Sequence, residues 1–346
     1  MRILLLGGSG LLSGAAREAF LAAGHDVTVV VRGTSPLPEH ERLHVRRADR
    51  HDVASLTAVL AGQRFDFTVD FLAFRAADVT GLFSVHGFGP GRLVMISTGQ
   101  VYLVTQDPRP PFREADANAP TIPEPEPATR AWYNWEYGMG KRDAEAALAR
   151  AGAEHGVPVL ALRCPVVQGE TDGANSRRLW AWLERMRDGG PLLLPDGGVQ
   201  PVRFVYAGDV AQALLRLAEH AAWPIEPALN LAQPNECSLR AFLEQVAACA
   251  GLMPRFVDVP GDVLEREGLA DACATYWGRW CSRPDPSAAI AALGFTPRGP
   301  EAYLPSVVRA HLAHPPATSH EGYAHRAREL ALAARLGGDA SSVRPA

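Results

Sequence analysis

Short runs of apolar, β-branched residues alternate with longer helical patterns along the first half of the chain. The apolar runs occupy Ile3–Leu6, Val27–Val31, Phe67–Leu72, Leu93–Ile96 and Val159–Leu162. Helical patterns lie between them at Leu11–Ala23, Ala54–Ala61 and Arg142–Ala153. Continuous apolar strands joined by helices predict a parallel sheet that is covered on both faces. We therefore expect a doubly wound α/β domain over residues 1–165.

The pattern becomes less regular after about residue 165. It predicts helices at Asp209–Glu219 and Leu239–Ala250, and short strands at Val202–Tyr206 and Leu229–Leu231. We expect residues 166–315 to form a smaller lobe with some elements returning to the main sheet, and residues 316–346 to form a C-terminal helix and tail. The proline-rich segment Asp107–Pro127 indicates a loop rather than a regular element.

Composition narrows the classes of protein that the chain can represent. Hydrophobic residues make up 47% of the chain, and the formal net charge is −4. A domain that grips nucleic-acid phosphates usually has a basic excess, so we expect no nucleic-acid partner. The apolar opening run is far too short to cross a bilayer, and the five cysteines are scattered, which favours a cytoplasmic protein without a membrane partner. The eleven histidines have no ligand spacing, so we expect no metal.

A glycine-rich turn follows the first apolar run, in the sequence MRILLLGGSGLLSG. Gly7 permits a tight turn and Gly10 lets the backbone approach a pyrophosphate, while Ser13 takes the place of the usual third glycine. Amide groups at the start of the following helix would face the phosphates. Strand, turn and helix at this position predict that residues 1–165 form a dinucleotide-binding (Rossmann) domain.

The residues after the second predicted strand bear on the choice of cofactor. NAD sites usually place an acidic residue there for the ribose hydroxyls, whereas a nearby arginine accommodates a 2′-phosphate. Here Val31 stands where the acid is expected, and Arg32 follows it. The sequence therefore favours NADP over NAD.

Two local patterns carry the candidate chemistry. Tyr137 and Lys141 are four residues apart, so a helix places both side chains on one face. A nearby ammonium lowers the pKa of a phenol, which makes Tyr137 a candidate general acid/base for an alcohol proton. Thr98 directly follows a predicted central strand, at the edge where open α/β sheets bind ligands, and could hydrogen-bond the reacting oxygen.

In this order of motifs the chain resembles the extended short-chain dehydrogenase/reductase family, in its NAD-dependent epimerase/dehydratase branch. The resemblance covers about residues 1–315. It rests on Gly7–Gly14, Asp49, Phe71–Ala73, Ser97–Tyr102, Tyr137 with Lys141, Leu162–Pro165, Val202–Asp209 and Ser287–Phe295.

The resemblance implies a role for each matching position. Thr98, Tyr137 and Lys141 would be catalytic, and Thr98, Gln100, Tyr137 and Arg203 would contact the substrate. The cofactor would be held by Gly7, Gly10, Leu11, Leu12, Arg32, Asp49, Arg50, Leu72, Ala73, Lys141 and Pro165. For Arg203 a salt bridge to an acid such as Asp209 is an equal alternative to a sugar-nucleotide phosphate. The family also implies a homodimer.

One departure from the family bears on the reaction. Its sugar-nucleotide 4,6-dehydratases follow the threonine with Asp-Glu, whereas this chain has Gly99 and Gln100. Because an amide cannot exchange a proton as a carboxyl group does, a 4,6-dehydratase is disfavoured. We expect hydride transfer at a secondary alcohol or ketone carbon of a sugar or sugar-nucleotide-like substrate.

Three interpretations stay open at this stage. The first is an epimerase that retains its NAD, and the second is a net ketoreductase that exchanges NADPH and acts on a non-nucleotide substrate such as a natural product. The third is a non-catalytic cofactor-sensing or RNA-binding protein, because the chain also resembles the sub-branch that includes chloroplast stem-loop RNA-binding proteins. The third is disfavoured, since the chain has no basic excess and an intact Thr/Tyr/Lys set has no purpose in a pure binder.

Overall fold

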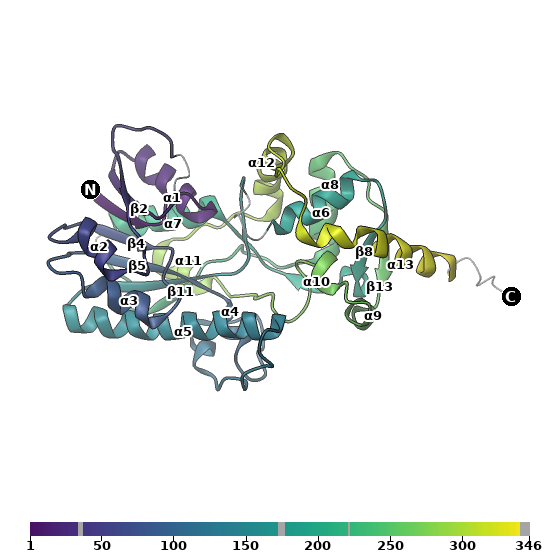
Figure 1. Ribbon diagram of the computed structural model, residues 1–346, viewed down its shortest axis with the longest axis horizontal. Coiled ribbons are helices and arrows are strands. Elements are labelled where there is room, and N and C mark those ends of the chain that lie inside the picture. Colours follow the sequence, from purple (N-terminus) through teal and green to yellow (C-terminus); the bar gives the residue numbers. More distant parts are fainter. Residues whose placement is uncertain (34–36, 172–176, 221, 340–346) are drawn as a thin grey trace. The chain divides into compact units, whose positions relative to one another are not determined.

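The computed structural model describes residues 1–33, 37–171, 177–220 and 222–339 (Figure 1). The chain forms two compact units. The first unit comprises residues 1–167, 204–233 and 282–297, and the second comprises residues 168–203, 234–281 and 298–346. The chain thus passes between the units several times.

The first unit contains a parallel sheet that, within the described residues, has seven strands in the order β11-β6-β5-β4-β1-β2-β3. The strands are β1 (Arg2–Leu6), β2 (Asp26–Val31), β3 (Leu43–Arg47), β4 (Phe67–Asp70), β5 (Arg92–Thr98), β6 (Val159–Cys164) and β11 (Ala228–Asn230). The predicted doubly wound parallel sheet is confirmed. Strand order reverses between β1 and β4, and ligands bind such sheets at the carboxyl ends of the strands beside this point.

The first unit also contains the helices that connect these strands. They are α1 (Leu11–Ala22), α2 (Val53–Leu60), α3 (Ala76–Phe83), α4 (Gln100–Leu103), α5 (Arg130–His155), α7 (Ala207–Glu219) and α11 (Ser287–Leu293). Helix α5 contains the YGMGK motif, as expected, but it begins at Arg130 and not near Tyr137. The Thr129 side chain accepts a hydrogen bond from the Trp132 backbone amide and caps the helix there. The proline-rich segment forms a loop with one 3₁₀ turn, η1 (Glu114–Asn118).

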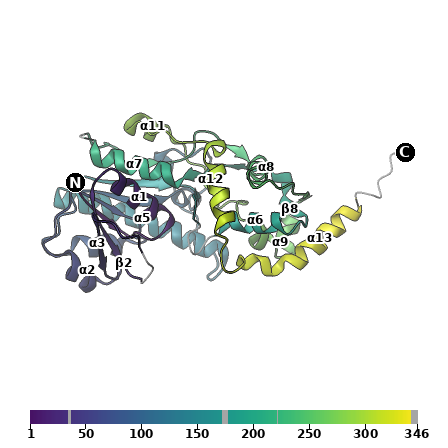
Figure 2. The ribbon, with the colours of Figure 1, turned by 90° about the horizontal axis from the view of Figure 1, so that it is seen from above.

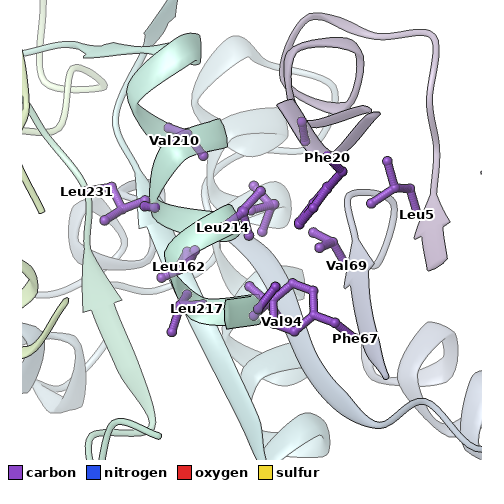
Figure 3. Packing of buried hydrophobic residues seen from close by; sticks show 14 of the residues in the cluster. Leu5, Phe20, Phe67, Val69, Val94, Leu162, Val210, Leu214, Leu217 and Leu231 are labelled. Atoms are coloured by element: carbon purple, nitrogen blue, oxygen red, sulfur yellow. The ribbon is translucent and has the colours of Figure 1, made fainter. Parts of the chain in front are cut away.

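Both faces of the sheet are covered. Successive residues of a strand point to opposite faces, so Ile3 and Leu5 join one core while Leu4 and Leu6 join the other. The first core is closed by α1, α7 and α11, and the second by α2, α3 and α5. Figure 3 shows Phe20 of α1 and Leu214 of α7 packed in the first core. Figure 2 shows α1 and α7 lying next to each other on their face of the sheet.

The second unit is built from short elements. Its strands form the parallel pair β8 (Leu192–Pro195) with β13 (Phe256–Val259) and the antiparallel pair β9 (Pro201–Val202) with β12 (Cys237–Ser238). Its helices are α6 (Arg178–Arg187), α8 (Leu239–Ala250), α9 (Gly261–Arg266), α10 (Ala270–Cys273), α12 (Pro300–Ala313) and α13 (Arg326–Asp339), with 3₁₀ turns η2 (Asp196–Gly198) and η3 (Glu321–His325). A buried ion pair between Arg185 of α6 and Glu329 of α13 fastens the last helix.

Two predicted segments and the question of membrane-spanning helices complete the description of the fold. The predicted strand Val202–Tyr206 is interrupted, since Val202 ends β9 and a separate strand β10 (Val205–Tyr206) pairs with β7 (Val167–Gln168). The predicted tail beyond residue 339 lies outside the described residues. No described helix combines the length and the apolar character needed to cross a membrane.

Candidate active site

The glycine turn after β1 has the geometry that a phosphate-binding loop requires. Gly7 has φ +110°, which side chains other than glycine rarely adopt, and a Cβ on Gly8 would lie 2.9 Å from a methyl group of Val29. Gly10 caps the N-terminus of the twelve-residue helix α1. The Gly10 amide donates to Oγ of Ser13 at 3.0 Å, so serine at the third glycine position reinforces the turn. The first amides of α1 are available to a phosphate.

A pocket of about 420 Å³ opens beside this turn, at the carboxyl ends of β1, β2 and β4. It is lined by Gly7, Gly8, Ser9, Gly10, Ser13, Val31, Arg32, Gly33, Ala48, Asp49, Arg50, His51, Leu72 and Phe74. Six of the predicted cofactor residues thus come together here: Gly7, Gly10, Arg32, Asp49, Arg50 and Leu72. Glycine turn, helix terminus and pocket together fit the pyrophosphate and adenosine portions of a dinucleotide.

The other predicted cofactor residues do not line this pocket. Leu12 packs against the core, and Pro165 is buried directly after β6. Ala73 is fully buried, and its carbonyl oxygen accepts a hydrogen bond from Lys141. Leu11 is the first residue of α1 and directly follows Gly10 of the glycine turn.

Basic groups surround the adenosine end of the pocket. Arg32 is exposed at its edge, and Val31 beside it is buried and offers no carboxylate. The Arg50 guanidinium is buried and forms a 2.6 Å ion pair with Asp70, so part of its charge is already balanced. The pocket therefore presents Arg32 as its exposed cation and has no acid at the position after β2.

Lys141 is the only lysine in the sequence. The other 33 residues of the Lys and Arg total are arginines. It lies on α5 with 2% of its surface exposed, and Nζ donates to the carbonyl oxygens of Ala73 and Ile96, both at 2.8 Å. Burial lowers the pKa of Lys141 to about 8, against the opposing charges of Asp70 and Glu145. Two of its three N–H groups are thus used by the loop after β4 and by β5, which leaves one for a ligand or for Tyr137.

Tyr137 lies one helical turn before Lys141 and, in contrast, has 40% of its surface exposed. Two glycines that follow it let α5 approach the segments after β4 and β5 closely. A Cβ on Gly138 would lie 2.5 Å from Val104 Cγ1, and one on Gly140 would lie 2.8 Å from the carbonyl oxygen of Phe74. The sequence YGMGK therefore holds an exposed phenol and a buried ammonium on one tightly packed helix.

Thr98 ends β5, as predicted, and its hydroxyl oxygen accepts a hydrogen bond from the Gln100 amide at 3.2 Å. This hydrogen bond uses a lone pair of the hydroxyl oxygen. The hydroxyl proton stays available for donation to another oxygen. The Gln100 side chain donates to Asn134 Oδ1 of α5 at 3.0 Å, so it links the strand end to the helix that carries Tyr137. Asn134 did not stand out in the sequence.

A buried polar network lies beneath the candidate catalytic residues. Glu145 of α5, one turn after Lys141, accepts a hydrogen bond from Ser97 and forms a 2.6 Å ion pair with Arg163 of β6. Arg163 also donates to the hydroxyl of Tyr102 at 3.0 Å. Burial raises the pKa of Tyr102 to about 12, which makes Tyr102 a poor proton donor. Glu145 could have been found from its spacing of four from Lys141.

Arg203, the remaining predicted site residue, belongs to the second unit. There its Nε lies 3.9 Å from a carboxylate oxygen of Glu236, and its Nη2 donates to the carbonyl oxygen of Pro234 at 3.2 Å.

Known proteins resemble this chain in sequence and in fold. The model of the NAD dependent epimerase/dehydratase family matches residues 3–232. The 2'-dehydrokanamycin reductase of Streptomyces kanamyceticus is 29% identical over 276 residues, which are 79% of this chain and 73% of that protein.

Among solved structures, UDP-glucose 4-epimerase of Thermotoga maritima superimposes with a TM-score of 0.68 at 17% identity, over 90% of this chain and 99% of that one. UDP-glucuronic acid 4-epimerase of Bacillus cereus, solved with UDP-glucuronic acid and NAD, gives a TM-score of 0.66 at 15% identity over the same shares. At these identities the solved structures establish the fold.

Proposed function

The chain belongs to the NAD dependent epimerase/dehydratase family and is a nicotinamide-dependent enzyme of the extended short-chain dehydrogenase type, and from this premise we propose that it reduces a ketone on a sugar-like ring. The observation that carries the proposal is the set formed by Thr98, Tyr137 and Lys141 at the carboxyl ends of the central strands. An exposed phenol, a buried ammonium and a hydroxyl with a free proton are the groups that proton transfer to a ketone oxygen needs.

Each of the three residues has a separate task in the proposed reaction. When bound, the nicotinamide cofactor supplies the hydride. Tyr137 donates its proton to the carbonyl oxygen as negative charge develops there, and Thr98 donates a hydrogen bond to the same oxygen. Lys141 places a positive charge one helical turn from Tyr137, which favours the phenolate that remains.

Gln100 favours redox chemistry without elimination of water. A neutral amide that already donates to Asn134 cannot act as the acid or base that an elimination requires. The product of the proposed reaction is therefore a secondary alcohol with the rest of the ring intact.

The name of the relative from Streptomyces kanamyceticus favours a net reduction over epimerisation. A 2′-dehydro group is a ketone, so a reductase of such a compound consumes one reduced cofactor per turnover. Exposed Arg32 and the missing acid at Val31 favour NADPH as that cofactor. We accordingly place NADPH ahead of NADH, and a sugar-like natural product ahead of a nucleotide sugar.

The test begins with the purified protein. It is denatured, and any released nucleotide is identified by mass spectrometry. NADPH oxidation is then followed with 2′-dehydrokanamycin and a panel of keto sugars, with Tyr137→Phe as the inactive control. Protein that is free of bound nucleotide and oxidises NADPH with one of these ketones supports the proposal. Stoichiometric retained NAD without net NADPH oxidation would instead support the epimerase.

A further inference from the structure

Phe74 lines the cofactor pocket and also contacts both Tyr137 and Lys141. It follows Ala73 after β4, and its backbone is fixed from two sides. The Phe74 amide donates to Asp78 Oδ2 at 2.7 Å, and its carbonyl oxygen packs so closely on α5 that Gly140 has no room for a Cβ. The position of the ring is therefore set by α3 and α5 together.

The ring of Phe74 contacts both halves of the YxxxK motif. Nζ of Lys141 lies 4.6 Å from the ring centroid, within the range of a cation–π contact. The ring of Tyr137 lies 6.1 Å away, centroid to centroid, with the planes tilted by 49°. Phe74 also lines the pocket beside the glycine turn.

The Lys141 ammonium is nearly sealed from water, so its surroundings decide how much charge it carries. Two carbonyl oxygens and the Phe74 ring surround it. The charged or titratable groups that act on it come from four elements: Asp70 of β4, Asp78 of α3, Glu145 of α5 and Cys164 of β6. None of these is altered by a substitution at Phe74.

We propose that Phe74 is a positioning residue whose ring covers the Lys141 ammonium, stabilises its charge through the π face, and thereby keeps a cation beside Tyr137 during proton transfer. The proposal rests on the proposed function for its catalytic meaning, but its physical content concerns Lys141 itself. Neither the family match nor the sequence motifs assign a role to this side chain.

The ring has two effects on the pKa of Lys141, and they have opposite signs. Different substitutions at Phe74 can therefore distinguish them. The π face favours the charged form of Lys141, whereas the exclusion of water disfavours it. Phe74→Leu keeps most of the cover and removes the π face, so the pKa of Lys141 falls. Phe74→Ala removes the cover as well and admits water, so the pKa rises. Phe74→Tyr retains both effects and leaves it unchanged.

The single lysine makes this measurable without an activity assay. Protein labelled with [6-¹³C]lysine gives one Cε resonance, which belongs to Lys141 and disappears in Lys141→Met. Titration of this resonance should show a fall of about half to one pH unit in Phe74→Leu and a rise of similar size in Phe74→Ala. Phe88→Leu, which removes a ring that packs on Phe65 elsewhere in the unit, serves as the matched control and should not shift it.

The pH profile of NADPH-dependent turnover, measured at saturating cofactor, provides the second readout. The alkaline limb of kcat/KM should move to lower pH in Phe74→Leu and to higher pH in Phe74→Ala. A resonance that shifts in the same direction in both variants, or in neither, would overturn the proposal, because Phe74 would then be only a wall of the pocket. Turnover that survives in Tyr137→Phe would refute the proposed function instead, and the lysine titration would still stand.

Discussion

The ammonium nitrogen of Lys141 lies 2.8 Å from the carbonyl oxygen of Ala73, at the carboxyl end of β4. This contact ties the helix that carries Tyr137 to the segment after β4, whose Leu72 and Phe74 line the cofactor pocket. Glu145 ties the same helix to β5 and β6 through Ser97 and Arg163. Helix α5 is thus held in place by polar contacts on its buried face, while 40% of the surface of Tyr137 stays exposed.

Replacement of Tyr137 by phenylalanine should abolish most of the turnover and leave the fold intact. Tyr137 is 40% exposed, so loss of its hydroxyl leaves the core unchanged. Removal of a general acid lowers kcat by about 100-fold or more. Tyr133→Phe, on the same helix with 57% of its surface exposed, is the matched control and should keep turnover within about twofold. Steady-state kinetics of the two variants, with thermal unfolding to check the fold, decides the matter.

The free energy of unfolding should depend on pH in a way that Lys141 explains. Burial lowers the pKa of Lys141 from 10.5 to about 8, so the unfolded chain binds more protons between these values. Stability contributed by this residue therefore rises with pH from about 8 to 10.5, and the charged form is destabilising below pH 8. The difference in unfolding free energy between the native protein and Lys141→Met should change by about 3 kcal/mol across this interval. Denaturant titrations at several pH values measure it, and a flat difference would contradict the burial argument.

Gly138→Ala should destabilise the protein by about 1–3 kcal/mol, because the new Cβ would lie 2.5 Å from Val104 Cγ1 and 3.0 Å from the carbonyl oxygen of Gln100. Gly14→Ala in α1 is the matched control, since its Cβ would meet nothing within 4 Å. There the intrinsic preference of alanine for helix should make the change neutral or stabilising by up to about 1 kcal/mol. Equal effects of the two substitutions on the midpoint of chemical unfolding would show that the close approach of α5 is unimportant.

Glu329→Gln should cost about 3 kcal/mol or more of stability. Glu329 is fully buried and receives two hydrogen bonds from the Arg185 guanidinium, at 2.6 and 2.9 Å. Removal of one partner leaves a buried charge uncompensated, which is far more costly than loss of a surface pair. Glu267→Gln is the control, because its pair with Arg335 of α13 is exposed to solvent and should contribute almost nothing. The midpoints of thermal unfolding of the two variants should differ by about 4 °C or more.

The sheet could be predicted because its strands are buried on both faces and read as continuous apolar runs. Strand β3 was missed for the opposite reason, since it is an edge strand whose residues from His44 to Arg47 are exposed. The early start of α5 was missed because its first turns carry aromatic and polar residues without a helical apolar stripe, and capping by Thr129 decides where it begins. The sequence indicated that some elements after residue 165 return to the main sheet, but it did not show which segments, because that depends on which distant residues pack together.

The candidate site was predictable only where a motif fixes the spacing. The glycine turn, Thr98 and the Tyr137–Lys141 pair are local patterns, and the structure brings each to the carboxyl edge of the sheet. Phe74 and Asn134 act through contacts across the sheet edge, with Lys141 and Gln100 respectively, and no local pattern marks them. Glu145 shares its helix face with Lys141, but its importance comes from Arg163, eighteen residues away.

Replacement of Arg32 tests the cofactor preference directly. Arg32 is the exposed cation at the edge of the pocket, where a 2′-phosphate would lie if NADP is the cofactor. A charge-assisted hydrogen bond stabilises a complex by about 1.5–3 kcal/mol, so Arg32→Ser should weaken NADPH binding by about tenfold or more. NADH has no 2′-phosphate, and its dissociation constant should stay within about twofold. Arg46→Ser, on the exposed edge strand and outside this pocket, controls for the general loss of positive charge. Fluorescence titration of the three proteins with both cofactors gives the comparison, and equal weakening for NADPH and NADH would mean that Arg32 contacts a part that the two cofactors share.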